Sequence, residues 1–513
     1  MSIRAALCNT VLFASPLLAQ PAIEWQKCLG GTAEDEINAI QQTSDGGYIA
    51  VGSTMSDDGD VTGNHGISDL WVVKLDSAGS IEWQRNFGGT STDVGYAARQ
   101  TLDSGYVVLG WTFSSDGDVI GNHGIVDVWV LRLDANGVVQ WQKCLGGSQW
   151  EMGRSILQTA DGGFLVYAET ESNDGDVSGY IGGGSDNWVV KLDPQGTMLW
   201  EKCLGGSASE WAGGISQATD GSYILAGYSY SNDSMVSGNH GFSDTWVAKL
   251  DTTGELLWQQ CIGGTDNDDG RAISANAFSG CVVGSSTSSN DGDVLGQHGI
   301  EDLLISMLDG TGGIQWHKCV GGTDLELSTS IIATAAGGAV ATGCTHSNDG
   351  DVFGNHGTED VWLIEIDLNG MLQWQKCLGG DQWESGNSVE HTSDGGYVVA
   401  GYTDSNNGDV TGNHGDRDGW VVKLAPVNAA IQEGTSLLFD HFPDPADTEV
   451  RIVTRGTSSF VELSLHDLGG RELQRMPLHG STHMLDVSDL APGMYVITLH
   501  NAEGRSSRRL VVE

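Results

Sequence analysis

A tryptophan recurs along this 513-residue chain at a spacing that constrains the fold more than any other feature. Each copy belongs to the same phrase, which reads IEWQKCLGG over residues 23–31. Successive copies are 58 or 59 residues apart and lie at Trp25, Trp83, Trp141, Trp200, Trp258, Trp316 and Trp374. Self-similarity at a fixed period is typical of repeat architectures. Seven copies of one structural unit are therefore expected over about 22–425.

Each repeat predicts four short strands, which in the first repeat lie at approximately 23–29, 37–43, 47–54 and 70–75. These segments are rich in Val, Ile, Tyr and Trp and are bounded by Gly, Asp, Asn and Ser, which is the composition of strands separated by turns. No stretch shows a sustained helical period with caps. The repeat is therefore expected to be all-β.

Four strands in each of seven repeats predict a seven-bladed β-propeller over 21–425. The meander of strands places the tryptophan strand of each repeat in the preceding blade. Strand 23–29 then has no preceding blade, and the seventh meander ends at Leu424 without a fourth strand. We expect these two strands to pair and close the ring, because an open ring leaves unpaired edges. A β-solenoid is the alternative architecture.

The two ends of the chain differ from the repeats. Residues 1–20 carry one cation, Arg4, before an apolar run, which predicts a signal peptide; a buried first helix is the alternative. Residues 426–436 are predicted to be a linker. Residues 437–513 lack Trp and Lys and alternate polar with apolar residues, which predicts a small Ig-like β-sandwich.

The charge of the chain excludes several kinds of partner. It has 23 Lys and Arg against 68 Asp and Glu, giving a formal net charge of −45. Binding of nucleic acid or anionic lipid requires clustered cations, so neither is expected. No mature segment has about 18 consecutive apolar residues, so no transmembrane helix is expected.

Six cysteines recur at one position of the repeat. Equivalent positions in neighbouring blades lie farther apart than the 7 Å or so that a disulfide allows between Cα atoms. We therefore expect small buried side chains between blades. The set comprises Cys28, Cys144, Cys203, Cys261, Cys319 and Cys377. Cys281 and Cys344 fall at other positions, and whether they pair is left open.

The long loop between the third and fourth strands contains a partial calcium-binding pattern. With Asp58 as position 1, oxygen-bearing side chains occupy positions 3, 7 and 12 and glycine occupies position 6. The candidate ligands of Ca²⁺ are Asp58, Asp60, Asn64 and Asp69, with Asp116, Asp118, Asn122 and Asp127 in the second repeat and Asp349, Asp351, Asn355 and Asp360 in the sixth. Position 5 lacks an oxygen in three repeats. Capping of turns by Asp and Asn is the alternative interpretation.

Two further polar positions recur near these loops. A histidine is expected to donate a hydrogen bond that fixes each loop, at His65, His123, His240, His298, His356 and His414. An acidic residue follows each Gly-Gly and is expected to make one face strongly negative: Asp35, Asp93, Glu151, Glu210, Asp268, Glu326 and Glu384. No catalytic motif is present, so no catalytic residue is assigned and an enzyme is not expected.

The tail carries motifs of a known family. They are Phe442-Pro443-Asp444-Pro445-Ala446, then LHDLGGR over 465–471, and then LDVSDLAPGMY over 485–495. Residues 437–513 therefore resemble the type A C-terminal sorting domain of the type IX secretion system. The resemblance implies contact with that secretion machinery and a location outside, or on the outer surface of, a Gram-negative-type bacterium.

The sequence thus predicts a secreted or cell-surface propeller that acts as a binding or adhesion module for a glycan or protein ligand. Two alternatives stay open. One is a polysaccharide-degrading enzyme with its site at the mouth of the axial channel, and the other is a structural component of a surface layer. An enzyme requires a single asymmetric group of polar residues.

Overall fold

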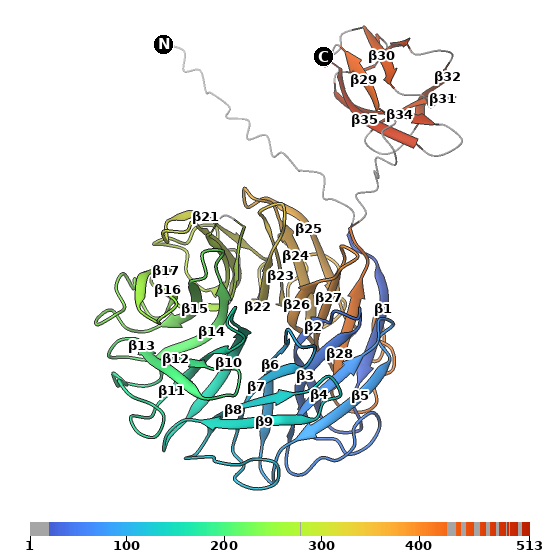
Figure 1. The fold of residues 1–513 in the computed structure, drawn as a ribbon. Coiled ribbons are helices and arrows are strands. Elements are labelled where there is room, and N and C mark those ends of the chain that lie inside the picture. Colours follow the sequence, from blue (N-terminus) through green and yellow to red (C-terminus); the bar gives the residue numbers. More distant parts are fainter. Residues whose placement is uncertain are drawn as a thin grey trace, which may run out of the picture. The chain divides into compact units, whose positions relative to one another are not determined.

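The computed structural model describes residues 20–277 and 279–427, and within the tail 438–442, 448–455, 462–467, 472–478, 482–488, 490–491, 493–500 and 505–512. The described residues form strands and turns (Figure 1). No helix among them is long and apolar enough to cross a membrane. The predicted signal peptide and most of the predicted linker lie outside the described residues.

Seven four-stranded antiparallel sheets follow one another along the chain, so the predicted propeller is confirmed. The first blade contains β2 (Asp35–Gln42), β3 (Tyr48–Thr54), β4 (Asp69–Leu75) and β5 (Ile81–Phe87). The second contains β6 (Asp93–Gln100), β7 (Tyr106–Thr112), β8 (Asp127–Leu133) and β9 (Val139–Leu145). The third contains β10 (Glu151–Gln158), β11 (Phe164–Thr170), β12 (Asp186–Leu192) and β13 (Met198–Leu204).

The remaining blades keep the same order. The fourth contains β14 (Glu210–Gln217), β15 (Tyr223–Ser229), β16 (Asp244–Leu250) and β17 (Leu256–Ile262). The fifth contains β18 (Asp268–Ala275), β19 (Cys281–Thr287), β20 (Asp302–Leu308) and β21 (Ile314–Val320). The sixth contains β22 (Glu326–Ala333), β23 (Ala339–Thr345), β24 (Asp360–Ile366) and β25 (Leu372–Leu378). The seventh contains β26 (Glu384–His391), β27 (Tyr397–Thr403), β28 (Asp418–Leu424) and the N-terminal strand β1 (Ile23–Leu29).

The ring closes as the sequence predicts. Strand β1 pairs antiparallel with β28, with Ile23 opposite Leu424 and Leu29 opposite Gly419. The blue β1 and the orange β28 accordingly lie side by side in Figure 1. The Trp420 indole also donates a 2.7 Å hydrogen bond to Gln26 across this seam. The two ends of the repeat region therefore stabilise each other.

The core lies between the blades. The two middle strands of every blade are almost wholly buried, because both of their faces pack against neighbouring blades. In six blades the third strand carries a fully buried tryptophan two residues after its first residue: Trp71, Trp129, Trp188, Trp246, Trp362 and Trp420. The six repeated cysteines are buried, as predicted, and all eight cysteines of the described residues, Cys281 and Cys344 included, are free thiols.

A second compact unit follows Pro426. Its strands form two sheets that share one apolar core, which confirms the predicted sandwich. The first sheet contains β29 (Leu438–Phe442), β30 (Glu449–Arg455) and β33 (Thr482–Asp486). The second contains β32 (Glu472–Pro477), β31 (Glu462–Asp467), β34 (Gly493–His500) and β35 (Arg505–Val512).

Candidate functional site

The first residue of the predicted calcium pattern caps a neighbouring turn. Both carboxylate oxygens of Asp58 accept hydrogen bonds from Thr32, one from its backbone NH at 2.7 Å and one from its hydroxyl at 2.8 Å. Asp116 binds Thr90, and Asp349 binds Thr323, in the same way. These bonds lower the pKa of Asp58 and Asp116. The exposed carboxylates thereby tie the long loop to the turn that precedes the first strand of the blade.

The last residue of the pattern is buried and binds the loop histidine. Asp69 accepts bonds from the His65 backbone NH at 2.9 Å and from the His65 ring at 2.7 Å. Asn64, at position 7, accepts from the Gly66 NH at 3.0 Å. The same histidine–aspartate bond recurs in the blades that carry His123, His240, His298, His356 and His414. The predicted role of these histidines is therefore confirmed.

The candidate calcium ligands of the first repeat bind two separate backbone segments. Asp58 binds Thr32, whereas Asn64 and Asp69 bind the neighbouring NH groups of Gly66 and His65. Within the propeller residues that the structure describes, no group of three or more His, Cys, Asp or Glu could hold a metal ion. Calcium binding by these loops stays a prediction.

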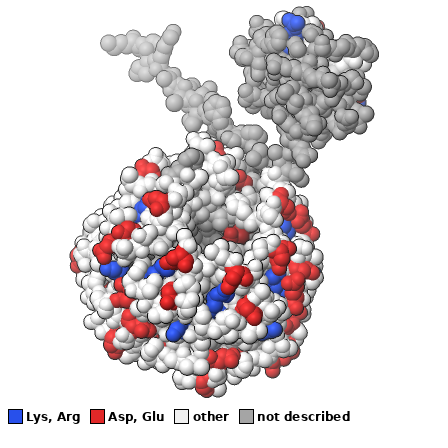
Figure 2. Space-filling model, viewed as in Figure 1, with Lys and Arg blue, Asp and Glu red and all other residues white. Residues whose placement is uncertain are grey.

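The acidic residues after each Gly-Gly are not exposed, so this part of the interpretation was wrong. All seven side chains are at most 1 % exposed. Asp35 accepts hydrogen bonds from the Gly31 NH, the Thr54 hydroxyl and the Ser56 hydroxyl. These donors make burial of a carboxylate tolerable and fix the start of β2. The Asp and Glu side chains spread over the face in Figure 2 belong to other positions.

Pairs of buried carboxyl groups lie at each junction between blades. A Cβ atom on Gly88 would lie 2.6 Å from Asp69 Oδ1 and 2.7 Å from Asp93 Oδ2. Only glycine therefore leaves room for both carboxyl groups. Burial raises the pKa of Asp69 and of Asp93, and the charge of Asp93 raises the pKa of Asp69 further.

The first strand of each blade, such as β2, lines the axial channel and is the innermost strand. The repeats diverge at one position of this strand. In every blade this strand has a β-bulge three residues after the buried acid, and a bulge re-aims the side chain it carries. The bulge residues are Asn38, Tyr96, Arg154, Gly213, Arg271, Thr329 and Asn387. Because the innermost strands surround the axis, these residues face the axial channel.

Three bulge residues donate hydrogen bonds to the backbone of a neighbouring blade. The amide of Asn38 donates to the Gly95 carbonyl at 2.9 Å, and the amide of Asn387 donates to the Ile37 carbonyl at 3.1 Å. The Thr329 hydroxyl bonds to the Gly386 carbonyl. On this side of the ring the bulge position has a structural role.

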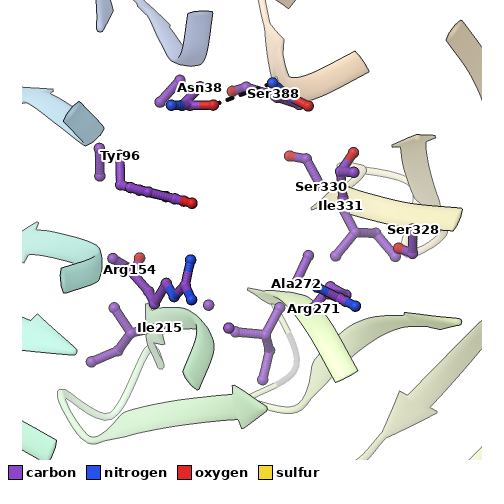
Figure 3. A pocket seen from close by; sticks show the side chains of 18 of the residues that line it. Asn38, Tyr96, Arg154, Ile215, Arg271, Ala272, Ser328, Ser330, Ile331 and Ser388 are labelled. Carbon is purple, nitrogen blue, oxygen red and sulfur yellow. Dashed lines mark hydrogen bonds between the residues drawn. The ribbon is translucent and has the colours of Figure 1, made fainter. Parts of the chain in front are cut away.

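The other four blades use the bulge position differently. Arg154 donates from Nε to Glu169 at 2.9 Å and lies 4.9 Å from the centre of the Tyr96 ring. Arg271 lies 5.7 Å from the centre of the Tyr228 ring. Gly213 lies between the two arginines in chain order and contributes no side chain. Together these blades line one side of a cavity of about 550 Å³, in which the side chains of Tyr96 and Arg154 project inward and Arg271 lies at the wall (Figure 3).

Aromatic side chains gather at the end of the channel where the innermost strands begin. Trp211 and Tyr228 stack with an interplanar angle of 10° and a centroid separation of 6.2 Å, and Tyr230 packs edge-on against Tyr228. We call the following set the aromatic rim: Trp111, Phe113, Trp150, Trp211, Tyr228, Tyr230, Trp383 and Tyr402. Each is partly or largely exposed. The equivalent positions of other blades hold unrelated residues such as Glu36, Ser53 and Asp269.

This site is not among the predicted sites, because its residues differ between the repeats and the predictions rest on residues that the repeats share. The residues that form the site occupy equivalent positions of the repeats at which the residue type changes from blade to blade. Most positions at the hairpins and junctions recur in nearly every blade, whereas the bulge position holds five residue types in seven blades. A fold needs the recurring residues, so the diversity of side chains at the bulge position, which lines the channel, indicates a role beyond folding.

The family to which the tail belongs indicates where the protein is located. Residues 440–513 match the family model described as the secretion system C-terminal sorting domain. The tail is a type IX sorting domain. It confirms the resemblance that the tail motifs carry, and it makes the chain a secreted or cell-surface protein that engages the type IX machinery. No curated protein matches the chain.

Several solved propellers are similar in architecture. The WD40 domain of Pan2 from Neurospora crassa is 12 % identical, with 79 % of this chain and 97 % of that chain covered and a TM-score of 0.44. PorZ, a surface component of the type IX secretion system of Porphyromonas gingivalis, is 12 % identical with a TM-score of 0.39. That match covers 94 % of this chain and 60 % of PorZ. Because these TM-scores are below 0.5, the assignment of the propeller fold rests on the pairing of the strands in the seven sheets.

Proposed function

We propose that this protein is a binding module of the bacterial surface or its surroundings, and that it captures its ligand at the aromatic rim and the adjoining axial channel. The sorting domain supplies export, and the propeller supplies recognition. The observation that carries the proposal is that the repeats diverge at the rim and the bulge positions, whereas the junctions between blades stay constant.

The chemistry of the rim supports recognition. Aromatic rings offer large contact areas with little entropic cost, and Tyr and Trp combine an apolar face with a polar atom. Sites for small ligands are concave and hold a few convergent polar groups, as this cavity does. The long loops that carry the partial calcium pattern, such as residues 55–69, are called the acidic loops below. Their carboxylates cap turns.

A hydrolase or lyase is the second candidate, because Glu169, Arg154 and Tyr96 form one asymmetric polar group in the channel. Glu169 is buried and ion-paired, so it is engaged in positioning the guanidinium. We therefore favour binding over catalysis.

A glycan array combined with a whole-cell binding assay tests the proposal on the full chain. The Trp211→Ala and Tyr230→Ala variants should lose at least ten-fold in affinity for the strongest ligand, since each removes a partly exposed aromatic contact. Phe353→Ala is the matched control, because Phe353 is 44 % exposed but lies in an acidic loop of the sixth blade. Equal loss in all three variants, or loss only in the control, would contradict a site at the rim.

A further inference from the structure

Two arginines line the channel of a protein whose net charge is −45. Arg154 and Arg271 occupy equivalent bulge positions of the third and fifth blades, and both line the same cavity. Lys and Arg account for only 23 of 513 residues. Their meeting at one cavity therefore creates a local site for an anion within an otherwise acidic molecule.

Arg154 is held in one orientation. Its Nε donates to Glu169 Oε1 at 2.9 Å, and the Glu169 side chain is only 5 % exposed. Glu169 also accepts from the Ala212 backbone NH at 3.2 Å, which fixes the carboxylate. Nη2 of Arg154 lies 3.9 Å from Met152 Sδ, a weak acceptor. The guanidinium also interacts with the Tyr96 hydroxyl, and its remaining N–H groups are donors for a carboxylate or sulfate oxygen.

Arg271 approaches from the other side of the fourth blade. Its side chain is 47 % exposed, and its ion pair with Asp269 is long at 3.4 Å. It lies over the ring of Tyr228, which also stacks on Trp211. The charge of Arg271 lowers the pKa of Glu169, as does that of Arg154, although burial raises it overall. Both cations therefore act on one region of the channel.

The fourth blade has no side chain at the bulge position between the two arginines. Its bulge spans Gly213 and Gly214, where the register jumps from Ala212 to Ile215. A Cβ atom on Gly213 would lie 2.6 Å from the Arg271 carbonyl oxygen. At the level of the arginines this blade therefore contributes only backbone. Closer to the rim it contributes the stacked side chains of Trp211 and Tyr228.

From this geometry we infer that the channel binds an acidic saccharide, with a carboxylate or sulfate held by Arg154 and Arg271 and a sugar ring lying against Trp211 and Tyr228. The inference rests on the proposed binding function and names its ligand class. Stacked rings present a flat apolar surface that suits a sugar ring, and the cavity has the size of a small-ligand site. The strongly negative protein repels an acidic peptide, which carries many charges close together.

Isothermal titration of the full chain tests the inference with defined probes. The carboxylate probe is 4-O-methylglucuronosyl-xylotriose, its neutral partner is xylotetraose, the sulfate probe is neocarratetraose monosulfate and the peptide probe is hexaglutamate. We expect at least one acidic saccharide to bind at least ten-fold more tightly than xylotetraose. Arg154→Gln and Arg271→Gln should each weaken that binding by about 10- to 100-fold. Arg85→Gln, on an outer strand, should leave it unchanged.

The outcomes are distinct. Which acidic saccharide binds identifies the source of the anion. Equal affinity for neutral and acidic saccharides, no binding of either acidic saccharide, or tighter binding of hexaglutamate overturns the inference. If an arrayed ligand of another class still depends on Trp211, the proposed function stands while the acidic-saccharide inference fails. Thermal unfolding of the glutamine variants must match the unmodified chain, and Arg271→Lys provides a folded variant that keeps the charge.

Discussion

The ammonium of Lys74 lies 3.1 Å from the carboxylate of Asp45, and this ion pair joins β4, the third strand of the first blade, to the hairpin between β2 and β3. The lysine side chain is 3 % exposed and the aspartate 56 % exposed. Equivalent pairs are Arg132–Asp103, Lys191–Asp161, Lys249–Asp220 and Lys423–Asp394. The two repeats that lack the cation also lack the acid, since they carry Met307 with Phe278 and Glu365 with Ala336.

This joint loss predicts strong energetic coupling between Lys74 and Asp45. Asp45→Ala should destabilise the propeller by about 1–3 kcal/mol, because it leaves a buried ammonium with fewer partners. Adding Lys74→Met should recover part of that loss. A double-mutant cycle by urea unfolding measures the coupling, which we expect at about 0.5–3 kcal/mol. Additive effects of the two substitutions would show that the pair does not act as a unit.

Asp186 should make stability depend on pH. Burial raises its pKa to about 7, and the third repeat has no loop histidine, so Asp186 accepts from the Ile181 backbone NH instead. An unfolded aspartate has a pKa near 4, so the folded chain binds the proton more tightly. The resulting stabilisation is complete below about pH 4 and is lost as the pH rises through about 7.

The Asp186→Asn variant checks this sign. It should remove part of the decline in unfolding free energy between pH 5 and 8, because the amide cannot ionise. Denaturant unfolding at several pH values measures the slope. An unchanged slope in the variant would show that Asp186 is not responsible.

The turn-capping bonds of Asp58 and its equivalents predict that the propeller does not need calcium for stability. The melting temperature should be the same in EDTA and in millimolar calcium, because Thr32 already satisfies both oxygens of Asp58. Differential scanning calorimetry makes the comparison. A fall of several degrees in EDTA would instead support the calcium sites that the loop sequences predict.

The propeller thiols should be unreactive in the folded protein. Burial raises the pKa of Cys28 and Cys144 to about 12, so almost no thiolate exists at pH 8. Iodoacetamide labelling with peptide mapping should modify none of the eight propeller cysteines until denaturant is added. Rapid labelling of any of them under native conditions would contradict the packing between blades.

The sequence predicted the parts of the fold that depend on recurring residues. The tryptophan period located the blades, and the unmatched strand 23–29 predicted the closure with β28. The histidine bonds followed from the type and spacing of the loop residues. The burial of Asp35 was missed because its hydrogen-bond donors, Thr54 and Ser56, come from another strand and the loop after it.

The channel site could not be predicted by the same reasoning. A bulge at Arg154 leaves no clear sequence signature, and its side chain enters the channel only because the strand register shifts there. The contact of Arg271 with Tyr228 joins two blades, so no spacing along the chain reveals it. Comparing the seven repeats with one another exposes the diverging positions, but only the closed ring places them together.

Hydrogen–deuterium exchange of the full chain, with and without the strongest ligand from the glycan array, tests the central claim most directly. We predict protection in peptides that cover β10, β14, β15 and β18, which carry Arg154, Trp211, Tyr228 and Arg271. Protection confined to the acidic loops, such as 55–69, or to the outer strands would contradict a binding site at the rim and channel.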